Sequence, residues 1–136
     1  MKNGKNGSNG KNHKFAYING VAHEIKSDHT SVLKFVKEHI NEKEIPSLCD
    51  DPNLAPYGAC RVCSVDVALK KDGPTRTVAS CHTPVTEGSY IITQNEDLTK
   101  LRKNIVELVL TDHPMTCSTC EVNNNCELQT VANDLN

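Results

Sequence analysis

The stretch Tyr57-Gly58-Ala59-Cys60-Arg61-Val62-Cys63 contains two cysteines that are separated by two residues. This spacing lets both sulfur atoms point at one metal centre while backbone amides turn toward it. Ten residues separate Cys49 from Cys60, and 17 separate Cys63 from Cys81. Four thiolates suit a tetrahedral zinc ion, a [2Fe–2S] cluster or a [4Fe–4S] cluster. Zinc sites usually show two close cysteine pairs, so the long first gap favours iron–sulfur over zinc.

A second group of cysteines follows further along the chain: Cys117, Cys120 and Cys126. Three cysteines are one ligand short of a four-ligand site. His113 fills this gap, because three residues separate it from Cys117 and Pro114 stiffens the turn between them. Seven cysteines and one histidine then make two complete four-ligand sites, and the odd number of cysteines is explained.

Alternatives to this assignment remain open from the residues alone. At the end of a helix, His113 is also suited to act as a C-terminal cation, which the helix macrodipole favours. His82, next to Cys81, competes as a ligand, although histidine-ligated Rieske centres need a pair of histidines from two motifs. Zinc in both sites would make the chain a zinc-binding interaction module.

Length and composition limit the chain to one modest core. It has 136 residues, seven cysteines and no tryptophan. An odd cysteine count argues against a secreted disulfide framework, and the N-terminus lacks the apolar segment of a secretory signal. We therefore expect a cytoplasmic location, where cysteines usually serve metal binding or redox chemistry. No apolar run approaches the length of a transmembrane helix, so we expect no membrane span.

Charge is distributed unevenly along the chain. Residues 1–14 hold four lysines and no acidic residue, and they repeat an Asn-Gly-Lys/Ser triplet with almost nothing to bury. We expect this segment to be a disordered tail. The remaining residues hold 11 basic and 17 acidic side chains. This acidic body argues against nucleic acid as a partner, because phosphate contacts need clustered lysine and arginine.

Hydrophobic periodicity predicts a small mixed sheet packed on one helix. Strands are expected at 15–18 and 21–25, because Asn19-Gly20 between them is a strong hairpin signal. A helix is expected at about 30–40, and further strands at 62–69, 75–80 and 90–92. A second helix is expected at about 96–111, with one apolar stripe formed by Leu98, Leu101, Ile105, Leu108 and Val109. The segment 113–136 is too short for a core of its own and needs the first domain or a metal.

Five segments carry a resemblance to a known family. Ile45-Pro46-Ser47-Leu48-Cys49, the 57–63 stretch and Ala79-Ser80-Cys81 resemble the β-grasp [2Fe–2S] domain of the large iron–sulfur subunit of respiratory complex I, of [FeFe]-hydrogenases and of NAD-linked formate dehydrogenases. Asp112-His113-Pro114-Met115-Thr116-Cys117-Ser118-Thr119-Cys120 and Asn125-Cys126-Glu127-Leu128-Gln129 are similar to the same group's [4Fe–4S] segment. The match covers about residues 15–133, with both motifs in the family's order.

The resemblance implies an α+β fold with two parts. Residues 15–94 would form a β-grasp (ubiquitin-like) [2Fe–2S] ferredoxin domain, and residues 95–136 a helix followed by a small [4Fe–4S] segment with one histidine and three cysteine ligands. The implied [2Fe–2S] ligands are Cys49, Cys60, Cys63 and Cys81. The implied [4Fe–4S] ligands are His113, Cys117, Cys120 and Cys126.

The function implied by the resemblance is electron transfer. The chain would be an iron–sulfur subunit or domain that relays single electrons within an NAD(P)-linked redox complex of the formate dehydrogenase or [FeFe]-hydrogenase type. Its expected partners are a flavin- or NAD(P)-binding subunit and a catalytic subunit. We expect no catalytic centre in the chain itself. The alternative function is that of a free-standing soluble ferredoxin.

Overall fold

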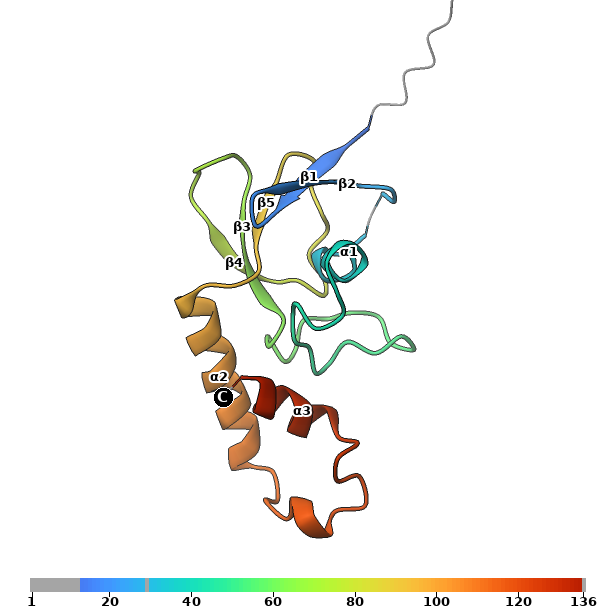
Figure 1. Cartoon of the computed structure of the whole chain (residues 1–136), viewed down its shortest axis with the longest axis vertical. Coiled ribbons are helices and arrows are strands. Elements are labelled where there is room, and N and C mark those ends of the chain that lie inside the picture. The colour runs from blue at the N-terminus through green and yellow to red at the C-terminus, as the bar shows by residue number, and fades with distance from the viewer. Residues whose placement is uncertain (1–12, 29, 136) are drawn as a thin grey trace, which may run out of the picture.

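A five-stranded sheet forms the first part of the molecule (Figure 1). The computed structural model describes residues 13–28 and 30–135. The strands are β1 (Phe15–Ile18), β2 (Val21–Glu24), β3 (Ser64–Ala68), β4 (Arg76–Ala79) and β5 (Tyr90–Ile92). They lie in the order β2-β1-β5-β3-β4, with β1 and β5 parallel and the other pairs antiparallel. The predicted order of strands and helix is confirmed.

The turn between β1 and β2 is made by Asn19 and Gly20, whose φ angles are 49° and 88°. Asparagine and glycine tolerate this left-handed region, so the hairpin prediction is confirmed. Asn19 also ties the hairpin to the end of β5. Its amide nitrogen donates to Oγ1 of Thr93 at 2.8 Å, and its Oδ1 accepts from the Thr93 N–H at 3.0 Å.

Helix α1 (Val32–His39) packs against the sheet and supplies four buried side chains. Ser31 caps it, because its side-chain oxygen accepts a hydrogen bond from the N–H of Lys34. The resulting main core includes two of the cysteines. Its buried members are Ala16, Ile18, Val32, Leu33, Phe35, Val36, Ile45, Cys63, Val65, Ala79, Cys81 and Ile91.

Helix α2 (Glu96–Thr111) has the predicted bounds, but it buries a different face. Three of the five residues in the predicted apolar stripe are exposed: Leu101, Leu108 and Val109, at 37, 69 and 39%. The stripe prediction was therefore wrong. The buried positions are Leu98, Arg102 and Val106, spaced by four residues. Hydropathy treats arginine as a surface residue, whereas Arg102 is buried here with its guanidinium bonded to backbone carbonyls.

The chain beyond α2 contains a short 3₁₀ turn, η1 (Cys117–Thr119), and a last helix, α3 (Glu127–Asp134). Neither element was predicted. Helix α3 lies against α2 (Figure 1), and Val131 of α3 shares a second small core with Val106 of α2 and with Val62. Helix α3 therefore packs on the rest of the fold through one buried side chain.

Two sequence predictions concern the N-terminal tail and the absence of a membrane-spanning helix. Residues 1–12 of the predicted tail lie outside the described residues, and Lys14 near its end forms a 2.9 Å ion pair with Asp28. Within the described part of the chain, no helix has the length and apolar character needed to cross a bilayer.

Candidate metal centres

The first four cysteines meet at one end of the β3–β4 ladder. Ser64 of β3 pairs with Ala79 of β4, so the chain positions just outside this pair bring Cys63 and Cys81 together. Both are buried, at 0 and 2% exposure. Cys49 and Cys60, from the long loop between α1 and β3, are partly exposed. The group thus has an inner half in the main core and an outer half toward solvent.

The four thiols act on one another electrostatically. Cys49 helps to lower the pKa of Cys60, and Cys63 helps to raise the pKa of Cys81. A [2Fe–2S] cluster needs four thiolate ligands, two on each of its irons. The donor set therefore fits a two-iron cluster.

Backbone N–H groups surround the sulfur of Cys60. Burial alone would raise the pKa of this thiol, but the N–H groups of Val62, Leu48 and Cys49, together with the Cys49 thiol, bring the pKa below its usual value. Hydrogen bonds to cysteine sulfur stabilise the charged ligand, and they also tune the potential of a bound cluster.

The inner pair has the opposite electrostatics. Burial, and then the charge of Cys63, raise the pKa of Cys81 to about 12, while a hydrogen bond from the N–H of Gly58 acts in the other direction. Gly58 has a φ angle of 65°, and a Cβ at this position would lie 3.3 Å from the Cβ of Ala79. Glycine is therefore needed for this approach of the loop to Cys81. His82, the competing ligand candidate, is exposed beside Gly58.

Ser80 fixes the backbone around the inner pair. Its N–H and its hydroxyl both donate to the carbonyl oxygen of Cys63, at 3.3 and 2.6 Å. Its own carbonyl accepts the N–H of Leu33 at 3.0 Å, which joins the start of α1 to this turn. Sequence reasoning did not single out Ser80, and its place next to a ligand cysteine was the only signal.

The four residues predicted for the second site line a single cavity of about 300 Å³. They come from the segment after α2, from η1 and from the start of α3: His113, Cys117, Cys120 and Cys126. A space of this size holds about ten water-sized objects, and the eight atoms of a [4Fe–4S] core fit within it. The structure therefore brings together all four residues that the sequence grouped.

The ring of His113 is oriented by its neighbour. Nδ1 lies 3.0 Å from the carbonyl oxygen of Pro114. Because a carbonyl only accepts hydrogen bonds, Nδ1 carries the proton and Nε2 keeps its lone pair for a metal. Histidine ligands of metals are commonly held in this way through their other ring nitrogen.

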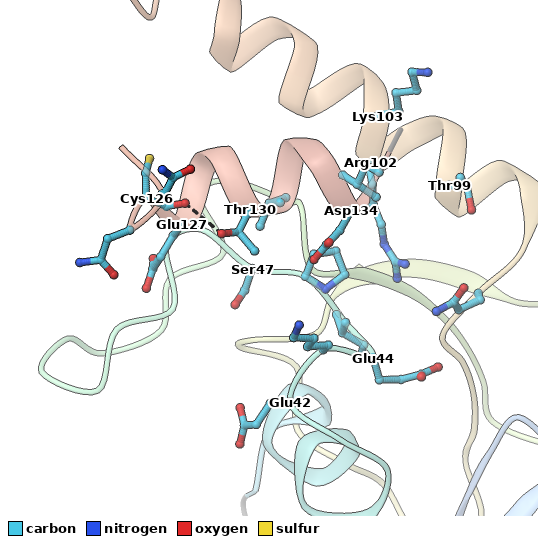
Figure 2. Close-up of a pocket in the computed structure, with 18 residues that line it drawn as sticks. Glu42, Glu44, Ser47, Thr99, Arg102, Lys103, Cys126, Glu127, Thr130 and Asp134 are labelled. Carbon is cyan, nitrogen blue, oxygen red and sulfur yellow. Dashed lines mark hydrogen bonds between the residues drawn. The ribbon is translucent and has the colours of Figure 1, made fainter. Parts of the chain in front are cut away.

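Hydrogen bonds from α3 hold the turn that presents Cys126. The N–H and hydroxyl of Thr130 donate to the Cys126 carbonyl at 3.0 and 3.1 Å, and Figure 2 draws the hydroxyl bond. Gln129 accepts from the N–H of Asn124 at 2.8 Å and donates to Oδ1 of Asn123 at 3.0 Å. The first turn of α3 thus positions the last ligand candidate.

The donors of the two groups do not gather around one point in the part of the chain that the structure describes. Among the described residues, no three His, Cys, Asp or Glu side chains lie close enough together to hold one ion. Ligands of one zinc ion all bond to the same atom, whereas ligands of a cluster are spread over several irons.

Comparison with protein families identifies both parts. A family model described as "2Fe-2S iron-sulfur cluster binding domain" matches residues 17–96. The chain belongs to this family. A second model, described as "NADH-ubiquinone oxidoreductase-G iron-sulfur binding region", matches residues 102–136. The [2Fe–2S] domain is thus followed by a [4Fe–4S] region, and the prediction of these two iron–sulfur cofactors is confirmed.

Curated relatives of the [2Fe–2S] domain are much longer proteins. The alpha chain of the NADPH-Fe(3+) oxidoreductase of Geobacter sulfurreducens is 41% identical over 85 residues, which cover 62% of this chain and 10% of the relative. One NADH-quinone oxidoreductase subunit of Escherichia coli (strain K12) is 39% identical over 87 residues, which cover 63% of this chain and 10% of the relative. The chain spans about a tenth of the length of these relatives.

A solved structure supports the fold over nearly the whole chain. It is described as an NAD+-reducing [NiFe]-hydrogenase in the H2-reduced state, and it matches with a TM-score of 0.73 and 25% sequence identity. The match covers 90% of this chain and 48% of the other. The α+β fold with a [2Fe–2S] ferredoxin domain is therefore confirmed.

Proposed function

We propose that the chain is a one-electron relay with two iron–sulfur clusters in a larger NAD(P)-linked redox complex. The observation that carries this proposal is the single cavity lined by His113, Cys117, Cys120 and Cys126 next to a [2Fe–2S] domain. An iron–sulfur cluster accepts and passes on one electron at a time, which suits a position between a two-electron cofactor and a second redox centre.

The proposed ligands of the [2Fe–2S] cluster are Cys49 and Cys60 on the outer iron and Cys63 and Cys81 on the inner iron. The burial of the four cysteines supports this division, because Cys63 and Cys81 share the main core while Cys49 and Cys60 are partly exposed. The N–H of Gly58 and the N–H groups around Cys60 would donate to the bound thiolates.

The proposed ligands of the [4Fe–4S] cluster are the three cysteines of the second cavity and Nε2 of His113. The bond between Nδ1 of His113 and Pro114 supports this role. A neutral imidazole in place of a thiolate removes one negative charge from the ligand set, which makes the cluster easier to reduce.

The proposed partners are a flavin- or NAD(P)-binding subunit and a catalytic subunit of the formate dehydrogenase or [FeFe]-hydrogenase type. The names of the relatives support an NAD(P)-linked assembly. Apolar side chains near the second site support a covering surface, since Leu108, Met115 and Val122 are 69, 69 and 50% exposed. Seven free thiols support a cytoplasmic location.

Purification of the native complex tests the proposed assembly. A tag on this chain should bring down a flavoprotein and a catalytic subunit in one size-exclusion peak. NAD(P)H added to that peak should bleach the visible absorption of the clusters. Elution of the chain alone, with clusters that NAD(P)H reduces only after another reductase is added, would instead identify a free-standing ferredoxin.

Single substitutions test the proposed ligands. Cys49→Ala should remove the [2Fe–2S] signal from the EPR spectrum of the reduced chain and leave the [4Fe–4S] signal. Cys117→Ala should do the reverse, and Ser118→Ala, next to it and also exposed, should preserve both signals. Retention of both signals in either cysteine variant would contradict the assignment of that residue.

A further inference from the structure

Arg102 is a charged side chain buried between α2 and the sheet, with 3% of its surface exposed. Nε and Nη2 both donate to the carbonyl oxygen of Ser64, at 3.2 and 2.7 Å. Nη2 also donates to the carbonyl oxygen of Thr93 at 2.7 Å. One guanidinium thus joins α2 to the first residue of β3 and to the end of β5.

The charge of Arg102 is not neutralised by a carboxylate in contact. None of the ion pairs found in residues 13–28 and 30–135 includes Arg102. Backbone carbonyls accept from Nε and Nη2 but leave the unit charge of the guanidinium in place. Burial lowers the pKa of Arg102, and the negative groups that oppose this effect are, in order, Cys63, Glu44 and Asp66.

The two carboxylates near Arg102 are bonded to other groups. Glu44 accepts from the hydroxyl of Thr93 at 2.5 Å. Asp66 accepts from the hydroxyl of Thr77 at 2.6 Å and from the amide of Asn95 at 2.8 Å. Cys63 immediately precedes Ser64, whose carbonyl oxygen Arg102 binds, and it comes first among the negative groups that oppose the lowering of the Arg102 pKa.

Figure 2 shows that Arg102 extends from α2 toward the loop that carries Glu44. Its side chain lines a cavity of about 710 Å³ that also includes Cys126 at the start of α3. The guanidinium thus lies at the end of the β3–β4 ladder, against Ser64, the residue that follows Cys63.

We propose that Arg102 is a positioning residue and a fixed positive charge for the [2Fe–2S] site, which holds β3 next to Cys63 and raises the reduction potential of the bound cluster. The inference rests on the proposed role of Cys63 as a ligand. Reduction adds one negative charge to the cluster, and a nearby buried cation stabilises that charge with little screening by salt.

Three variants separate charge from packing. Arg102→Gln removes the charge and keeps the N–H donors of a side-chain amide. Arg102→Lys keeps the charge but loses the planar set of N–H donors of the guanidinium. Lys103→Gln is the matched control, because Lys103 is the next residue of the same helix and is exposed to solvent. Each full-length chain is titrated potentiometrically and the [2Fe–2S] signal is followed by EPR.

Arg102→Gln should shift the balance of oxidised to reduced cluster at a fixed potential about tenfold toward the oxidised form, which for one electron equals a decrease of about 59 mV. Arg102→Lys and Lys103→Gln should each change the ratio of oxidised to reduced cluster by less than about threefold. A purely structural role would lower stability in both Arg102 variants without separating their potentials.

A loaded Arg102→Gln chain with the potential of the unmodified chain would overturn the inference. If Arg102→Gln binds no cluster, Glu44→Gln tests the inference in its place. This substitution removes a negative charge near Arg102 but keeps the oxygen that accepts from the Thr93 hydroxyl. It should shift the cluster toward the reduced form, and an unchanged potential would overturn the inference. If the unmodified chain shows no [2Fe–2S] signal at all, the proposed function fails instead.

Discussion

The side-chain hydroxyl of Ser80 donates a 2.6 Å hydrogen bond to the backbone carbonyl oxygen of Cys63. Ser80 is fully buried, and it immediately precedes Cys81. Ser80 therefore helps to fix the relative position of Cys63 and Cys81. The pairing of β3 with β4 stops at Ser64 and Ala79, and beyond it the Ser80 hydroxyl adds to the longer bond from the Ser80 N–H.

Ser80→Ala should destabilise the [2Fe–2S] site. The substitution removes a buried donor and leaves the Cys63 carbonyl with only the longer bond from the Ser80 N–H. We expect the free energy of unfolding to fall by about 0.5–1.5 kcal/mol, measured by denaturant titration with the cluster absorption as the signal. Thr99→Ala is the control, since its hydroxyl also bonds a backbone carbonyl but is exposed. Equal effects of the two variants would contradict a special role for Ser80.

Gly58→Ala should weaken the same site through its left-handed backbone and its contact with Ala79. The φ angle of 65° is unfavourable for alanine by about 1–2 kcal/mol, and the new Cβ would meet the Cβ of Ala79 at 3.3 Å. Gly88→Ala is a matched control, because its φ angle is 75° and nothing lies within 4 Å of the added Cβ. Both variants should lose stability, but only Gly58→Ala should lose the [2Fe–2S] cluster faster, as followed by the decay of its visible absorption. Cluster lifetimes that match in the two variants would count against the close approach of Gly58 to Cys81.

His113→Cys should lower the reduction potential of the [4Fe–4S] cluster. A fourth thiolate adds one negative charge to the ligand set, so the reduced state becomes harder to reach. The measurement is a potentiometric titration followed by EPR of the [4Fe–4S] signal. His82→Ala should leave this potential unchanged, since His82 does not line the second cavity. An unchanged or higher potential in His113→Cys would remove His113 from the ligand set.

Removal of iron should disorder the segment that holds the second site. Nearly all side chains from 112 to 126 are exposed, and the second core has a single buried residue from this end of the chain, Val131. Metal ligation then supplies the stabilisation that packing does not. Hydrogen exchange before and after chelation should show loss of protection at residues 113–126, with smaller changes in β1 and β2. Full protection of this segment without iron would contradict the prediction.

Features with a local signal were predictable from the sequence. Asn19-Gly20 gave the hairpin, and the spacing from His113 to Cys126 grouped four residues that the structure brings to one cavity. Helix α3 has eight residues and one buried side chain, so its stability comes from packing on α2 and its local signal is weak.

Features that depend on distant partners were missed. Ser80 acts on a carbonyl 17 residues away, and Arg102 acts on one 38 residues away. Neither distance leaves a periodic pattern in the chain. A polar residue on the buried face of a helix, four positions from Leu98 and from Val106, was the one available sign of Arg102.

Mössbauer spectroscopy of the full chain, loaded with ⁵⁷Fe, tests the two-cluster account most directly. The account predicts an iron-to-chain ratio of about six. It also predicts two components in the oxidised spectrum, with about one third of the iron in a [2Fe–2S] and two thirds in a [4Fe–4S] environment. A spectrum with only one type of cluster, or a chain that binds zinc in place of iron at either site, would contradict it.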